Sequence, residues 1–303
     1  MEVISLVSVA AGLFGAPLLL GIINRTKALV AGRRGQPLLQ LYFDLSRLLR
    51  KGATYSVTTS WVFRAGPVVG LAAILTALLL MPLGHNAAVL AFPGDVIVFA
   101  YLLGLARFFT MNAALDTGSA FEGLGAGREA HYGALAEPAL FLALAALAFQ
   151  SGAWSLSSML SGFQEVNFGV NAVVFTLVAL VLLVVVLTEN CRVPVDDPNT
   201  HLELTMIHEV LVLDHSGPDL AFILYGAALK LWVLGGLLVG VINPFDAANP
   251  WIELSLNVAG LGALAVVIGL IESSMARLRL IRVPRLLAGA SVLAAVALTL
   301  AAR

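Results

Sequence analysis

The stretch GVNAVVFTLVALVLLVVVLT, residues 169–188, decides the fold class of this chain. It contains no charged side chain, and it has the length of about 20 apolar residues that a helix needs to cross a bilayer. Seven further stretches share this character, although three of them contain a charge well inside the apolar run, at Arg107, Glu137 or Lys230. The other predicted spans lie, in chain order, at about 4–24, 65–83, 94–113, 133–152, 220–242, 252–272 and 283–302.

The composition of all 303 residues points the same way. Hydrophobic residues make up 60% and charged residues 12%, with a mean hydropathy of +0.96, whereas soluble domains are about 25% charged. These values exclude a soluble globular enzyme, a disordered chain and a nucleic-acid binder with a basic face. They also exclude a β-barrel, whose strands are about ten residues long. We predict an all-α, multi-pass membrane protein with about eight transmembrane helices, formed as one integral membrane domain over residues 1–303.

Basic residues orient the predicted spans, because Lys and Arg are concentrated in cytoplasmic loops. Fourteen of the 17 Lys and Arg residues fall in the loops on one side of the predicted membrane. We therefore predict that this side is cytoplasmic, that both termini lie on the outer side, and that the N-terminus begins the first span rather than a cleaved signal. The fourteen are Arg25, Lys27, Arg33, Arg34, Arg47, Arg50, Lys51, Arg64, Arg128, Arg192, Arg277, Arg279, Arg282 and Arg285.

The first predicted cytoplasmic segment, 32–64, contains GRRGQPLLQLYFDLSRLLRKG at residues 32–52. Over 38–51 leucines and a tyrosine fall on one side of a helix and polar residues on the other. Its basic flanks suit an anionic membrane surface. Two interpretations stay open: an interfacial helix without a specific partner, or a helix that docks another subunit.

The second cytoplasmic segment is a loop predicted at 114–131, within RFFTMNAALDTGSAFEGLGAGREAHYGALAEP at residues 107–138. Its glycines are expected to interrupt the helix between the third and fourth spans. Glu137 follows inside the fourth span, directly before Pro138, and a carboxylate at that depth is costly unless it is paired or hydrated. Glu137 is therefore a candidate for proton transfer, or for a structural ion pair with Arg107 or Arg128. Glu129 is a further candidate for ion pairing.

The third cytoplasmic segment, predicted at 189–219, is acidic. Arg192 is its one base, and its acids are Glu189, Asp196, Asp197, Glu203, Glu209, Asp214 and Asp219. Proximity in the sequence predicts that Arg192 pairs with Asp196 and Glu189. Clustered carboxylates raise one another's proton affinity, which suits proton transfer or pairing with a basic partner surface. The histidines 201, 208 and 215 are seven residues apart, which does not place two ligands on one helix face, so we predict no metal site.

Two further residues complete the candidates. Lys230, in the sixth span, could carry or gate protons, since a buried lysine changes charge readily, or could pair with Glu189 or Glu272. Cys191 is the single cysteine, so no intrachain disulfide and no cysteine-ligated cluster can form, and no catalytic nucleophile is expected.

Three motifs carry a resemblance to a known family: residues 32–52, ALDTGSAFEGLGAGRE at 114–129 with AEP at 136–138, and ENCRVPVDDPNTHLELTMIHE at 189–209 with LDHSGPDLA at 213–221. The chain resembles the membrane-anchor subunit of energy-converting (group 4) membrane-bound [NiFe]-hydrogenases, of the formate hydrogenlyase subunit 4 type. That family is homologous to subunit 1 of respiratory complex I. Where the complex I pattern has a Glu-Tyr pair, this chain has Asp214–His215, as in the hydrogenase branch.

The resemblance implies a subunit in the cell (inner) membrane that links a cytoplasmic redox arm to a membrane ion-translocating arm. Its implied partners are hydrogenase-like large and small subunits, antiporter-like membrane subunits and lipid. This chain would bind no cofactor, because the [NiFe] centre and the iron–sulfur clusters belong to the partner subunits. Two alternatives stay open, a quinone-site subunit of a respiratory NADH dehydrogenase-like complex and a stand-alone secondary transporter. The motifs imply that the junction residues are Glu137, Glu189, Arg192, Asp196, Glu203 and Asp214. Taken with the analysis of the spans, we predict proton transfer or coupling at Glu137, Glu189, Asp196, Glu203, Asp214 and Lys230, and structural ion pairs at Arg107, Arg128, Glu129 and Arg192.

Overall fold

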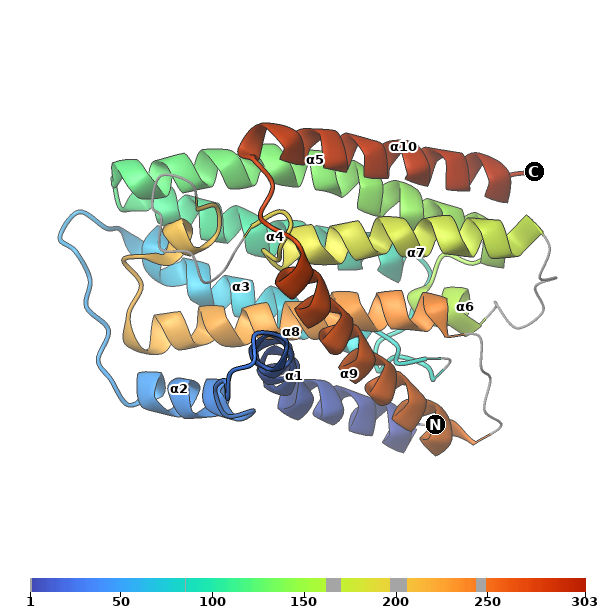
Figure 1. Ribbon diagram of the computed structural model, residues 1–303, viewed down its shortest axis with the longest axis horizontal. Helices are drawn as coiled ribbons and strands as arrows, with labels where there is room; N and C mark the ends of the chain where they lie inside the picture. Colours follow the sequence, from blue (N-terminus) through green and yellow to red (C-terminus); the bar gives the residue numbers. More distant parts are fainter. Residues whose placement is uncertain (1, 85, 162–169, 197–205, 244–248) are drawn as a thin grey trace.

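A computed structural model of the chain describes residues 2–84, 86–161, 170–196, 206–243 and 249–303 as a bundle of long helices (Figure 1). Within these residues there is no strand. The elements are α1 (Glu2–Val30), α2 (Gln40–Leu49), α3 (Trp61–Leu80), α4 (Asp95–Asp116), α5 (Ala120–Ser151), α6 (Leu156–Ser161), α7 (Val170–Glu189), η2 (Glu209–Val212), α8 (Gly217–Ile242), α9 (Pro250–Ser274), η3 (Leu280–Arg282) and α10 (Val283–Ala301).

Eight of these helices are long and apolar enough to cross a membrane, and each overlaps one of the eight predicted spans. They are α1, α3, α4, α5, α7, α8, α9 and α10. The all-α, multi-pass fold is thus confirmed. Both chain ends lie at the same end of the bundle, on the right of Figure 1, as an even number of spans requires. Which side of the membrane this end faces stays a prediction.

Helix α8 is the centre of the bundle, and it has the largest buried share among the eight spanning helices. It contacts α1, α2, α3, α7 and α9, while α5 packs against α4, α7 and α10. Helix α9 crosses the bundle obliquely in front of α8 (Figure 1). Most of the side chains on α8 are therefore covered by protein within this chain.

The helix interruption expected from the glycines of 114–131 is wrong for most of that segment. Only Gly118, with a positive φ of 71°, separates α4 from α5, and α5 is already helical from Ala120. Gly125 has a packing role instead, because a Cβ there would collide with the Val210 side chain of η2. A glycine in a helix can thus mark a close neighbour rather than a break.

The start of α3 and the end of α4 are joined by one carboxylate. Asp116 accepts hydrogen bonds from the Ser60 backbone N–H (2.6 Å), the Ser60 hydroxyl (2.8 Å) and the Phe63 N–H (3.2 Å). Ser60 in turn caps α3 by accepting from the Val62 N–H. These bonds satisfy backbone donors that a helix start leaves free, and they fix the two helices at this end of the bundle.

Helix α2 forms over Gln40–Leu49, inside the predicted 38–51. It lies at the end of the bundle opposite the termini and contacts α1 and α8 (Figure 1). Leu41 packs against the main core, whereas Phe43 and Leu49 are exposed. That α2 lies in the membrane interface, or docks another subunit, stays a prediction.

Candidate functional site

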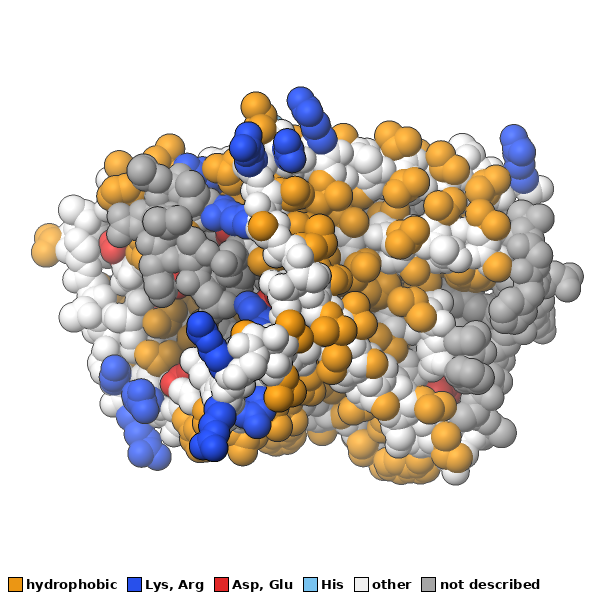
Figure 2. All heavy atoms as spheres, viewed as in Figure 1, with side chains coloured by type: hydrophobic (Ala, Val, Ile, Leu, Met, Phe, Trp, Pro, Cys, Tyr) orange, Lys and Arg blue, Asp and Glu red, His pale blue; other side chains and the backbone are white. Residues whose placement is uncertain are grey.

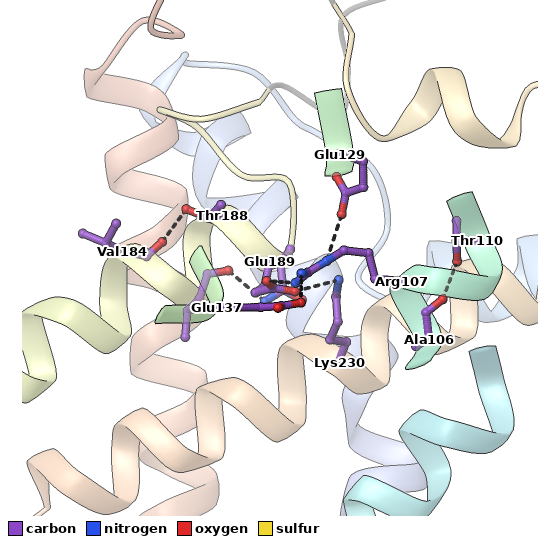
Figure 3. Close-up of polar contacts among 11 residues, drawn as sticks. Ala106, Arg107, Thr110, Glu129, Glu137, Val184, Thr188, Glu189 and Lys230 are labelled. Atoms are coloured by element: carbon purple, nitrogen blue, oxygen red, sulfur yellow. Dashed lines mark hydrogen bonds and ion pairs between the residues drawn. The ribbon is translucent and has the colours of Figure 1, made fainter. Parts of the chain in front are cut away.

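One arginine forms ion pairs with three carboxylates from two other helices. The Arg107 guanidinium of α4 lies 2.6 Å from Glu137 Oε1 and 3.5 Å from Glu129 Oε1, both on α5. It also donates to Glu189 Oε1 at the end of α7. On the other side of Glu189, Lys230 of α8 places its Nζ 3.6 Å from Oε2 (Figure 3). We call these five residues the Arg107 network, and it connects four membrane-spanning helices.

Helix periodicity and one glycine position the network. Glu129, Gly133 and Glu137 are four residues apart in turn, so they share one face of α5, the face towards Arg107. A Cβ on Gly133 would lie only 2.5 Å from the Arg107 NH1 nitrogen and 2.9 Å from its Cδ and Cζ. The missing side chain at Gly133 therefore makes the space in which the guanidinium reaches both glutamates.

The network is buried except at one end. The side chains of Arg107 and Glu189 are 8% and 6% exposed, whereas that of Glu137 is 46% exposed. The network holds three carboxylates but only two cations, so full ionisation leaves one negative charge in excess. An uncompensated charge in such surroundings is costly, and one bound proton removes it.

A cavity of about 70 Å³ adjoins the network between α3, α4, α5 and α8. Arg107, Glu129 and Lys230 line it together with Thr110 and His208. This volume exceeds the roughly 10–15 Å³ that a single water molecule requires, and the lining offers polar partners for water. Burial, followed by the positive charge of Lys230, lowers the pKa of His208 to about 4. The imidazole is therefore neutral at pH 7.

A second ion cluster joins α1 to α9. Glu272, near the end of α9, lies 2.8 Å from the Lys27 Nζ of α1 and 3.3 Å from the Arg192 NH1 nitrogen. The Glu272 carboxylate is fully buried, whereas Lys27 is about one quarter exposed. This cluster anchors the turn after α7 to the same end of the bundle as α2.

Asp196 organises the start of the acidic segment. Its carboxylate lies 3.0 Å from the Arg277 guanidinium and accepts from the backbone N–H groups of Ile207 (3.2 Å) and His208 (3.1 Å). Arg128 of α5 donates to the Met206 carbonyl at 2.8 Å. The segment around 206–208, which brings His208 to the cavity, is thus held by both charged groups and backbone bonds.

The comparison with known proteins decides the family. Residues 2–302 match the family described as NADH dehydrogenase. The chain belongs to the NADH dehydrogenase family. Formate hydrogenlyase subunit 4 of Escherichia coli (strain K12) is 32% identical over 277 residues, which cover 89% of this chain and 89% of that protein. Hydrogenase-4 component C of the same strain is 34% identical over 241 residues, covering 79% of this chain and 74% of that protein.

The fold of this NADH dehydrogenase family member is shared with a solved structure. A chain of the membrane-bound sulfane sulfur reductase, an archaeal respiratory membrane complex, matches with a TM-score of 0.85 at 20% identity. The match covers 99% of this chain and 98% of that one. Together with the two relatives, it confirms the resemblance inferred from the three sequence motifs. The relatives are named as a subunit and a component, so family members of this kind work in assemblies with other subunits.

The structure brings together the predicted residues Arg107, Glu129, Glu137, Glu189 and Lys230. Of the pairings left open, Arg107 rather than Arg128 is the partner of Glu137, and Glu189 rather than Glu272 is the partner of Lys230.

The pairing expected for Arg192, with Glu189 and Asp196, differs from the one observed. Glu189 is engaged by the Arg107 network, and Arg192 reaches across to Glu272. Asp214 is exposed, and its backbone N–H donates to Glu122 Oε1 at 3.3 Å, apart from the Arg107 network. Glu203 lies outside the described residues.

The sequence did not predict two features of this region: the space that Gly133 leaves for Arg107, and the ion pair between Lys27 and Glu272. Glu272 had a visible signal, since it is an acid at the end of a predicted span. Gly133 had none, because a glycine that makes room for a guanidinium looks like any other glycine in a spanning helix.

Proposed function

We propose that this protein is the membrane-anchor and proton-coupling subunit of a multisubunit, complex-I-like hydrogenase of the formate hydrogenlyase type in the inner cell membrane. It would link a cytoplasmic redox arm to a membrane ion-translocating arm. The two hydrogenase-related relatives support this choice over a quinone-site subunit. The [NiFe] centre and the iron–sulfur clusters would belong to hydrogenase-like large and small subunits on the cytoplasmic side.

The observation that carries the proposal is the half-exposed Glu137 at the edge of a buried chain of charges. A carboxylate in a membrane-spanning helix is costly against lipid, so such residues face protein or water. With 46% of its side chain uncovered within this chain, Glu137 is expected to face a neighbouring membrane subunit. An antiporter-like subunit would supply the covering surface and receive the proton.

The charge balance of the Arg107 network supports a role in coupling. A proton that neutralises its excess negative charge can be held or released when a nearby redox reaction changes the local field. Glu129 and Lys230 line the cavity that His208 borders, and Glu137 lies at the other end of the network. The proton would enter from the cavity, move between carboxylates and leave at Glu137, without any covalent change in this chain.

The cytoplasmic end offers surface for the redox arm. Val57, in the connection between α2 and α3, is fully exposed, and Leu213 and Asp214 are exposed after η2. Apolar side chains left open beside an acidic segment are typical of a surface that another subunit covers. These segments lie on the side of the chain that the basic residues predict to be cytoplasmic.

Purification through a tag on this chain tests the assembly. We expect hydrogenase-like large and small subunits and antiporter-like subunits to co-purify, with nickel and iron found by metal analysis. Isolation of the chain alone, with solute uptake after reconstitution, would instead identify a stand-alone transporter.

The variant Glu137→Gln tests the coupling role, since glutamine keeps the size and hydrogen bonding of glutamate but cannot ionise. We expect an assembled complex with nearly unchanged dye-linked hydrogenase activity and reduced proton translocation per turnover in vesicles. The matched control is Asp44→Asn on α2, a carboxylate bonded to Gln40 outside the network, which should translocate normally. Proton translocation at the wild-type ratio in assembled Glu137→Gln would make Glu137 a structural residue.

A further inference from the structure

A groove between the last turns of α1 and the start of α2 combines a cation with an apolar wall. Arg25 lines it together with Pro37, Leu38, Leu39 and Phe43. Leu38 and Leu39 are each 47% exposed and Phe43 is 55% exposed. Because α1 is long and apolar enough to cross a membrane and Arg25 lies near its end, we expect the groove to lie at the boundary between the hydrocarbon core and the headgroups.

Contacts between α1 and the chain before and within α2 shape this groove. Gly21 permits the approach, since a Cβ there would collide with the Leu38 carbonyl. The Tyr42 hydroxyl donates to the Phe14 carbonyl, and the Arg25 guanidinium donates to the Arg34 carbonyl. The apolar wall and the arginine are therefore held at a defined separation.

The surroundings of the groove are strongly positive. Lys and Arg side chains gather over α2 and the end of α1 in Figure 2, whereas much of the same face is hydrophobic. Between residues 25 and 52 the one acidic residue is Asp44, and the exposed basic residues are Arg25, Arg33, Arg34, Arg47, Arg50 and Lys51. Such an excess of positive charge at a membrane boundary attracts anionic headgroups.

We propose that this groove is a binding site for an anionic phospholipid. Its phosphodiester would lie against Arg25 and the neighbouring basic side chains, and an acyl chain would cover Leu38, Leu39 and Phe43. A free phosphate ion would leave these apolar side chains in water. A zwitterionic lipid would bring a second cation into an already positive region. This site is independent of the proton-coupling role proposed above.

Photo-cross-linking of the intact complex in phosphatidylcholine nanodiscs tests the proposal. The discs are doped with a photoactivatable phosphatidylglycerol or with the matching phosphatidylcholine, and labelling is measured on the tryptic peptide of residues 35–47. We expect phosphatidylglycerol to label this peptide about fivefold more than phosphatidylcholine. This ratio corresponds to the preference for an anionic headgroup that one nearby basic residue gives. Excess inorganic phosphate should not abolish the preference.

Two variants separate a specific site from general surface charge. Arg25→Gln should remove most of the preference for phosphatidylglycerol, because Arg25 is the cation in the groove. Arg285→Gln, an exposed arginine near the start of α10, should keep it. Equal labelling by both lipids, or a full preference in Arg25→Gln, would overturn the proposal. Protection of the peptide from both lipids would mean that a protein subunit fills the groove, and loss of labelling with phosphate would identify an ion site instead.

Discussion

Replacing Gly133 with alanine should disturb the Arg107 network without touching any of its charges. The added methyl group would lie 2.5 Å from the Arg107 NH1 nitrogen, well inside van der Waals contact. The guanidinium has to retreat by about 1 Å to restore ordinary contact distances of about 3.5 Å. Because it is held by Glu137 and Glu189, this movement lengthens ion pairs that the wild-type protein keeps short.

The expected cost follows from the geometry. Lengthening the 2.6 Å contact with Glu137 to about 3.5 Å weakens the attraction by about 1–2 kcal/mol at an effective dielectric constant of about 20. Solvent screening at the half-exposed Glu137 lowers this figure, and the weakened Glu189 contact adds to it. A total of about 1–3 kcal/mol is in the range of an overpacked site.

Gly127→Ala is the matched control. Gly127 lies in the same helix and is exposed, and a methyl group added there would have no neighbouring atom within 4 Å. Alanine is favoured over glycine in helices by about 1 kcal/mol. Both variants gain this helix stability, and Gly127→Ala measures it without a contact to Arg107. The difference between the two variants is then the effect of the Arg107 contact.

Thermal unfolding of the purified complex measures the stability, and proton translocation per turnover in vesicles measures the coupling. We expect Gly133→Ala to unfold at a lower temperature than Gly127→Ala and to translocate fewer protons, with dye-linked activity retained. If the two alanine variants behave alike in both measurements, Gly133 does not hold the space for Arg107 and the geometric argument is refuted.

Three further outcomes are expected. Arg192→Lys keeps the charge but loses the planar guanidinium, so the purified complex should be less stable, and a wild-type unfolding temperature would exclude a guanidinium-specific role. Lys27→Met and Glu272→Gln should each destabilise the complex, and the double variant should cost less than the sum of the two, as a double-mutant cycle of unfolding free energies would reveal. Burial lowers the pKa of His208 from about 6.5 in an unfolded chain to about 4 in the folded protein. Above about pH 6.5 the imidazole is neutral in both states, so it does not reduce the free energy of unfolding. As the pH drops towards 4 the unfolded chain binds a proton more readily than the folded protein, and the free energy of unfolding falls by up to about 3 kcal/mol. His208→Gln should reduce the loss of thermal stability between pH 7 and pH 5, and an unchanged loss would show that other groups cause it.

The spanning helices could be predicted from the sequence because their signal is local. A run such as 169–188 has no alternative to a membrane or a protein core, whatever its neighbours are. The same local argument identified Arg107, Glu137 and Lys230, since a charge inside such a run is costly wherever the helix packs. Three motifs were also long enough to indicate the family.

Helix boundaries near glycines depended on packing instead. The glycines of 114–131 indicate a loop by intrinsic preference, yet α5 continues through three of them. Contacts with η2 and with neighbouring helices outweigh the conformational freedom of glycine there, and the close approach at Gly125 requires a residue without a side chain.

The partners of the charges were decided by the tertiary structure alone. Sequence proximity favoured Asp196 and Glu189 as partners of Arg192, but the rotation and crossing of the helices bring Glu272, 80 residues away, to its guanidinium. Gly133 acquires its role only because α4 and α5 pack with Arg107 against it. The cost of burying a charge is a property of one residue and its span, whereas the choice of its counter-charge depends on which faces of separate helices meet.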